Sequence, residues 1–132
     1  MEKKVIPFGS AMGMKVAFST AVSVDVKSVE KIIWVSGQVS FDEKGNILGK
    51  DDMYVQTEHV ILNIQSALAE FGAGLDDVVE VNVFVRDMSR LKEIHEARLK
   101  YFKEPFPTST LVEVNKFVHP DALIEINAVA VI

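Results

Sequence analysis

The chain has 132 residues, 48% apolar and 25% charged, a composition typical of one globular domain, residues 1–132, with a buried core. It has no cysteine, which excludes a disulfide framework, a thiolate nucleophile and a Cys-ligated metal. The net charge of −5 argues against nucleic-acid binding. No signal peptide or membrane-spanning apolar run is recognised, so we expect a cytoplasmic protein.

The first half of the chain predicts two strands and a helix. Val16–Val26 mixes apolar and small polar residues as a strand does, and Ile32–Ser40 is a short apolar run typical of a buried strand. A polar, glycine-containing loop over Phe41–Lys50 follows. Apolar residues at helical spacing then predict a helix over Asp52–Phe71, with an aspartate cap at its start and Gly72 beyond its end.

The second half of the chain predicts three strands and one more helix. Val78–Val85 alternates as a strand does. A helix is expected over Ser89–Phe102, with Ser89 as its N-cap and two prolines beyond its end, and strands are expected over Thr108–Val114 and Leu123–Ile132. This order predicts an α+β fold in which both helices cover one face of a sheet.

Such a sheet would leave one apolar face without a cover. In the last strand Ile124 and Ile126 belong to one face, whereas Val129 and Val131 belong to the other. An open apolar face is a liability for a small monomer. We therefore expect copies of the chain to associate through these faces. Trp34, in a predicted buried strand, is interpreted as a core aromatic.

One carboxylate interrupts the apolar pattern of the last strand. Glu125 lies between Ile124 and Ile126, and a charge in such a run costs several kcal/mol unless it is paired or solvated. Glu125 is therefore either a general acid or base in a wet cleft or a structural carboxylate hydrogen-bonded across an interface between subunits.

Several segments together resemble the RidA family, also called YjgF or L-PSP, over about residues 16–132. They are WVSGQVS, QTEHVILNIQSALAEFGAGLDDVVEVNVFVRDM, LVEV and LIEINAVAV. The resemblance implies a fold like that of chorismate mutase from Bacillus. It also implies a homotrimer whose sheets pack inward, with small-molecule clefts between subunits. Deaminases of this family hydrolyse reactive enamines and imines, such as 2-aminoacrylate, to keto acids and ammonia.

The resemblance also shows where this chain departs from the deaminases. Their arginine that grips the substrate carboxylate is replaced by Ser109, a common tyrosine by Phe18, and an asparagine of the second helix by His95. Glu125 matches the carboxylate thought to position the hydrolytic water. Since hydrogen bonds to charged groups contribute roughly 1.5–3 kcal/mol each, we expect the substrate not to be an ordinary 2-imino acid.

The candidate site residues have plainer interpretations beside the functional ones. Ser109 is either a pocket hydrogen-bond donor or a small polar strand residue, since no nucleophile elbow is present. His95 is either a pocket base or a partly exposed helix residue without a role. Gly37 either admits a ligand to the backbone or forms a bulge. The other expected substrate-binding residues are Phe18, Ser36, Gln38 and Leu111.

The chain leaves three functions open. It could hydrolyse an enamine or imine with Glu125 activating water, or be a trimer that only binds a metabolite. The family's endoribonuclease label suggests RNA cleavage, against which the acidic balance argues. We expect a small-molecule ligand, no cofactor, no metal and no membrane partner. A counter-charge for Glu125 could come from Lys15, Arg98 or Lys116, which the sequence cannot place.

Overall fold

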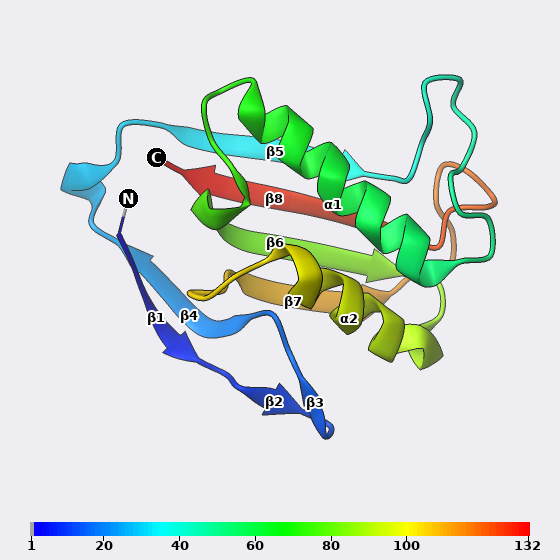
Figure 1. Ribbon diagram of the computed structural model, residues 1–132, viewed down its shortest axis with the longest axis horizontal. Helices are drawn as coiled ribbons and strands as arrows, with labels where there is room; N and C mark the ends of the chain where they lie inside the picture. The colour runs from blue at the N-terminus through cyan, green and yellow to red at the C-terminus, as the bar shows by residue number, and fades with distance from the viewer. Residues whose placement is uncertain (1) are drawn as a thin grey trace.

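The computed structural model describes residues 2–132. At its centre is a four-stranded mixed sheet in the order β5-β8-β6-β7 (Figure 1). Strand β8 runs antiparallel to both β5 and β6, whereas β6 and β7 run parallel. The bounds of these strands are β5 Ile32–Gln38, β6 Val78–Val85, β7 Thr108–Glu113 and β8 Ile124–Val131.

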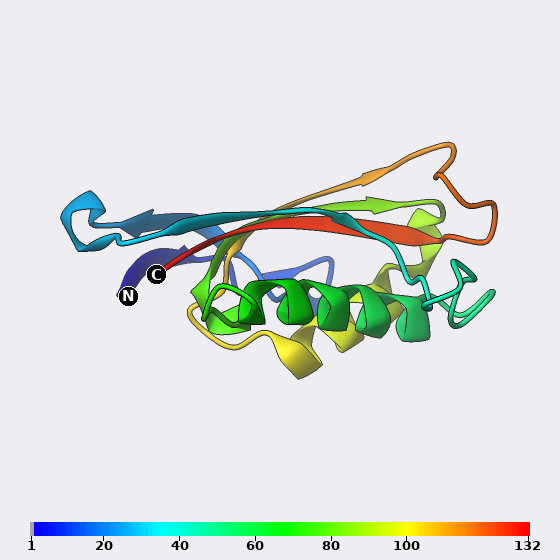
Figure 2. The same ribbon diagram turned by 90° about the horizontal axis from the view of Figure 1, so that it is seen from above.

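Two helices, α1 Met53–Ala69 and α2 Leu91–Tyr101, cover one face of this sheet (Figure 2). The Asp52 side chain accepts a hydrogen bond of 3.0 Å from the Val55 backbone N–H and so caps α1. Beyond its end Gly72 takes φ 78°, which favours glycine. The predicted α+β fold with both helices on one face is therefore confirmed. No helix within residues 2–132 is long and apolar enough to cross a membrane.

The N-terminal segment differs from the prediction. Strand β1 Lys3–Pro7 pairs antiparallel with β4 Ser19–Val24, and the two-residue strands β2 Ser10–Ala11 and β3 Met14–Lys15 lie between them in the chain. At the start of β4 the Ser19 backbone N–H donates to the Pro107 carbonyl at 2.8 Å. This bond ties the N-terminal hairpin to the chain just before β7.

The second helix begins later than the sequence indicates. Three short 3-10 turns occur within residues 2–132, namely η1 Val26–Ser28, η2 Leu75–Asp77 and η3 Met88–Arg90. In η3 the Asp87 side chain accepts from the Ser89 backbone N–H and is the cap. The expected role of Ser89 as N-cap is therefore wrong. An aspartate two residues earlier starts the turn, and α2 follows from it.

The other face of the sheet carries exposed apolar side chains. Trp34 is 71% exposed and lies opposite Val129 in the β5–β8 register. Ile32 and Val112 on the two outer strands are also exposed. The interpretation of Trp34 as a core aromatic is wrong, because the side chains of β5 alternate and only Ile33 and Val35 face the helices.

Candidate functional site

A pocket of about 270 Å³ lies between helix α2 and strand β7. Leu91, His95 and Arg98 recur at spacings of four and three residues, which places them on one stripe of the helix. Ser109 and Leu111 are two residues apart and project from the same face of β7. The lining residues are Ala11, Phe18, Met88, Leu91, His95, Arg98, Ser109 and Leu111.

Five polar side-chain atoms of this pocket have no hydrogen-bond partner among residues 2–132. Arg98 is 1% exposed and His95 6%. The three guanidinium nitrogens of Arg98, the Nδ1 atom of His95 and the Oγ atom of Ser109 are buried without a hydrogen bond from any of residues 2–132. The idea of His95 as a partly exposed helix residue is therefore wrong.

The charge of the pocket rests on Arg98. Burial lowers the pKa of Arg98 to about 10, so the guanidinium stays protonated at neutral pH. Burial first, and the positive charge of Arg98 second, lower the pKa of His95. His95 is therefore a neutral imidazole at pH 7.

Glu125 lies on the opposite face of the sheet. Its neighbours Ile124 and Ile126 are buried toward the helices, so the half-buried Glu125 points toward the uncovered face, opposite Phe84 in the β6–β8 register. A shallow groove of about 380 Å³ runs past it. The groove is lined by Phe84, Val114, Lys116, Phe117, Val118 and Glu125.

The backbone of Gly37 lies directly beside the Glu125 side chain. A Cβ built on Gly37 would overlap the carboxylate of Glu125, so a larger residue at position 37 would require that side chain to move. The close approach at Gly37 is thus made by a side chain of the same chain. Beside it the Gln38 side-chain amide donates to the Ser36 carbonyl at 3.1 Å.

The expected site residues therefore form two groups. Phe18, His95, Ser109 and Leu111 line the pocket under α2. Glu125 lies with Gly37 on the other face. Of the three cations considered as counter-charges, Arg98 is in the pocket, Lys116 lines the groove beside Glu125, and Lys15 lines neither.

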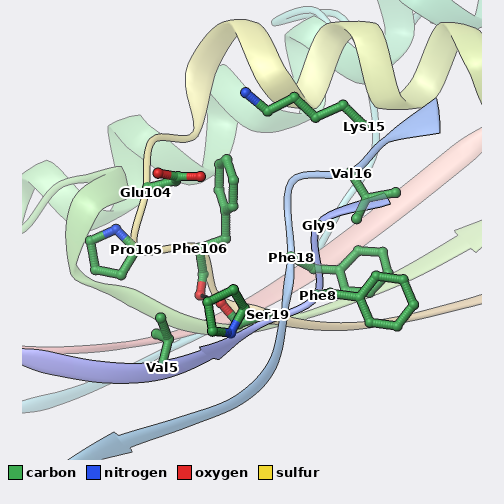
Figure 3. Close-up of a pocket in the computed structure, with 11 residues that line it drawn as sticks. Val5, Phe8, Gly9, Lys15, Val16, Phe18, Ser19, Glu104, Pro105 and Phe106 are labelled. Atoms are coloured by element: carbon green, nitrogen blue, oxygen red, sulfur yellow. Dashed lines mark hydrogen bonds between the residues drawn. The ribbon is translucent and has the colours of Figure 1, made fainter. Parts of the chain in front are cut away.

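A second cavity, of about 400 Å³, shares Phe18 with this pocket, and Figure 3 shows the residues that line it. It is mainly apolar and lies between the N-terminal hairpin and the residues just before β7. The Phe8 and Phe18 rings lie against each other with centroids 4.8 Å apart. Sequence reasoning missed this cavity, because the short strands that form its wall have no periodic signal. Within residues 2–132 no group of three or more His, Cys, Asp or Glu side chains could hold a metal.

Comparison with known proteins identifies the family. The family model described as Endoribonuclease L-PSP matches residues 9–132. The chain belongs to the RidA/YjgF/L-PSP family. Among curated proteins, it is 38% identical over 102 residues to a RutC family protein of Pyrococcus abyssi, covering 77% of this chain and 80% of that one.

Two further relatives of this RidA-family chain are informative. It is 36% identical over 107 residues to the 3-aminoacrylate deaminase RutC of Acinetobacter baylyi, covering 81% of this chain and 84% of that one. The solved structure of the Rid protein YyfB from Yersinia pestis superimposes with a TM-score of 0.80 at 26% identity, over the full length of both chains. The fold expected from the resemblance is therefore confirmed.

Proposed function

We propose that this RidA-family protein is a homotrimer that hydrolyses a small enamine or imine in clefts between its subunits. The position of Glu125 carries the proposal. Glu125 faces away from the helices, whereas His95, Ser109 and Leu111 line a pocket beneath them. The two groups cannot meet in one chain, so a complete site needs the Glu125 face of one copy against the pocket of another.

The proposed chemistry is addition of water to a carbon–nitrogen double bond. An enamine first takes a proton at carbon and becomes an imine. Glu125 then accepts a proton from a water molecule as the oxygen bonds to the imine carbon. The proton passes to the nitrogen and gives an amino alcohol. Glu125 then carries the hydroxyl proton to the nitrogen as the carbon–nitrogen bond breaks, and a carbonyl compound and ammonia leave. One water is consumed for each ammonia, and Glu125 returns to its initial state.

The pocket would hold the substrate while Glu125 acts. Its walls are largely apolar, with Phe18, Leu91 and Leu111 among them. Few polar groups in an apolar cleft are typical of small-molecule sites. The curated name of the RutC relative, a 3-aminoacrylate deaminase, supports an enamine as the substrate class.

The test is ammonia release from freshly generated 2-aminoacrylate, 2-iminobutanoate and 3-aminoacrylate. General acid–base catalysis contributes about 10²–10⁴-fold, so Glu125→Gln should lower turnover of the active substrate at least a hundredfold. Glu80→Gln is the matched control, since Glu80 is an exposed carboxylate on the neighbouring strand β6, and it should keep wild-type turnover. Undiminished turnover in Glu125→Gln would contradict the proposal.

A trimer that only binds a metabolite would give a different result. The compound would raise the melting temperature in a saturable way, following mass action, while mass spectrometry would find no product. RNA cleavage would require nuclease activity that survives purification and disappears in Glu125→Gln.

A further inference from the structure

Arg98 is an unusual residue in the interior of this chain. It is 1% exposed and has the largest side chain among the fully buried residues. None of its three guanidinium nitrogens bonds to a group of residues 2–132. Removing the partner of a buried charge is strongly destabilising. An unpaired guanidinium at this depth therefore indicates that its partner comes from outside the chain.

The surroundings of Arg98 have the character of a ligand pocket. The buried Ser109 Oγ, which reaches the cavity from β7, and the His95 Nδ1 also lack hydrogen-bond partners within residues 2–132. Unpartnered polar atoms from a helix and a strand thus converge on one cavity of about 270 Å³. Its remaining walls are apolar, which strengthens an electrostatic interaction inside it.

The single positive charge of the pocket indicates which kind of ligand would bind there. Arg98 is the one charged side chain among the residues that line it, and His95 is neutral at pH 7 because burial lowers its pKa. A single positive charge matches a monoanion better than the dianion of phosphate. The planar fork of a guanidinium also fits the two oxygens of a carboxylate.

We propose that Arg98, with the Ser109 hydroxyl, binds the carboxylate of a small organic acid in this pocket. The cation comes from helix α2, whereas Ser109 reaches the pocket from strand β7. This revises the expectation that the substrate is not an ordinary 2-imino acid, because Arg98 supplies a cation for a substrate carboxylate. The inference rests on the proposed function only in taking the acid to be the substrate or product of the reaction.

The experiment measures binding of pyruvate by isothermal titration calorimetry, with pyruvamide as its neutral analogue and inorganic phosphate as a dianion. Wild-type protein should bind pyruvate at least tenfold more tightly than either. Arg98→Met should weaken pyruvate binding at least tenfold, since it removes charged hydrogen bonds, while the melting temperature should not fall, since it removes an unpaired buried charge. Arg98→Lys, which keeps the charge without the fork, should bind with intermediate affinity.

Equal affinities for pyruvate and pyruvamide, tighter binding of phosphate, or unchanged pyruvate affinity in Arg98→Met would overturn the proposal. If Arg98→Met does not fold, the NMR signal of the Arg98 Nε–H in the wild type decides. It should shift on addition of pyruvate but not of pyruvamide, and an unmoved signal overturns the proposal. Glu80→Gln, which changes an exposed carboxylate that does not line the pocket, should retain pyruvate binding. Failure of ammonia release therefore tests the hydrolase, and failure of pyruvate binding tests the role of Arg98.

Discussion

The pairing of Gly37 with Glu125 fixes where the proposed catalytic carboxylate points. A side chain at position 37 would require the Glu125 carboxylate to move, because the carboxylate occupies the place of a Cβ. The backbone of β5 thereby supports a side chain of the neighbouring strand β8. In the sequence Gly37 is visible only as a break in an apolar run, and nothing there indicates that a side chain packs against its backbone.

Gly37→Ala should displace the Glu125 side chain. The atoms in the way are the far end of a flexible side chain, so the loss of stability should be small, at most the lower end of the ~1–3 kcal/mol of core overpacking. A misplaced general base should nevertheless lower turnover. Denaturant unfolding and ammonia release measure the two effects. Gly74→Ala is the control, because a Cβ at Gly74 meets nothing within 4 Å and its φ is −138°. Wild-type stability and turnover in Gly37→Ala would show that Glu125 does not depend on this contact.

The burial of His95 and Arg98 is not evident from the sequence. Charged and polar residues of a helix are usually exposed. The burial of Arg98 and its proximity to Ser109 therefore could not be predicted from the sequence. The identities of the pocket residues Phe18, His95 and Ser109 were found through resemblance, and their proximity became visible only in the fold. The burial of Arg98 is the part of the site that no sequence pattern indicates.

The pH dependence of stability should carry the signature of His95. Its pKa is lowered in the folded protein by burial and then by Arg98, so the unfolded chain binds the proton more readily. Folded stability should therefore fall as the pH drops below about 6.5, the ordinary histidine pKa.

His95→Asn should remove part of the stability difference between pH 7.5 and pH 5, measured by denaturant unfolding at both values. His59→Asn makes the same change at a histidine of α1 outside the pocket and controls for the loss of an imidazole as such. An identical pH dependence in wild type and His95→Asn would contradict the assignment.

At the scale of elements, long periodic segments were predictable and short ones were not. Helix α1 and strand β6 have strong periods of apolar residues, and the structure confirms both. Strands β2 and β3 have two residues each and hence no period to detect. The predicted start of α2 was two residues too early, because Asp87 caps a 3-10 turn that precedes the helix.

Gln56 joins helix α1 to the segment that leads into β8. It is fully buried, its side-chain amide donates to the carbonyls of Gly49 and Asp121, and its oxygen accepts from the Leu123 backbone N–H at 2.8 Å. One side chain thus bonds to three backbone groups, of which the Gly49 carbonyl also accepts from the Asp52 backbone N–H at 2.9 Å. This network fixes the start of the strand that carries Glu125.

Gln56→Met should lower the free energy of unfolding by on the order of 3 kcal/mol, because it leaves buried backbone groups without partners. Chemical denaturation measures the change. Gln65→Met is the control on the same helix, since Gln65 is exposed, and it should change stability by less than about 0.5 kcal/mol. Equal effects of the two substitutions would contradict the role of Gln56.

At the scale of the whole molecule, one face of the central sheet carries exposed apolar side chains that neither helix covers. Exposed Ile32, Trp34 and Val112 lie on the face that also carries Glu125. The sequence predicted an apolar second face from alternation alone, but it could not show that Trp34 belongs to it. Association through this face is what would bring Glu125 to another copy.

Trp34→Lys should therefore disrupt the assembly. Light scattering on the wild type should give three times the 14.7 kDa of one chain, and Trp34→Lys should shift the mass toward one chain, because burying a lysine charge at an interface is costly. Val26→Lys is the control at a site 81% exposed on the η1 turn, and it should stay trimeric. A monomeric wild type would refute the assembly.

Complementation between two inactive variants tests the division of the site between copies most directly. Glu125→Gln removes the carboxylate, and Leu111→Trp fills the pocket under α2. Each alone should be nearly inactive in ammonia release. Unfolded together in equal amounts and refolded, they should regain about a quarter of wild-type activity, since random cyclic assembly gives that share of clefts two intact halves. Activity no higher than that of the separate variants would contradict a site shared between subunits.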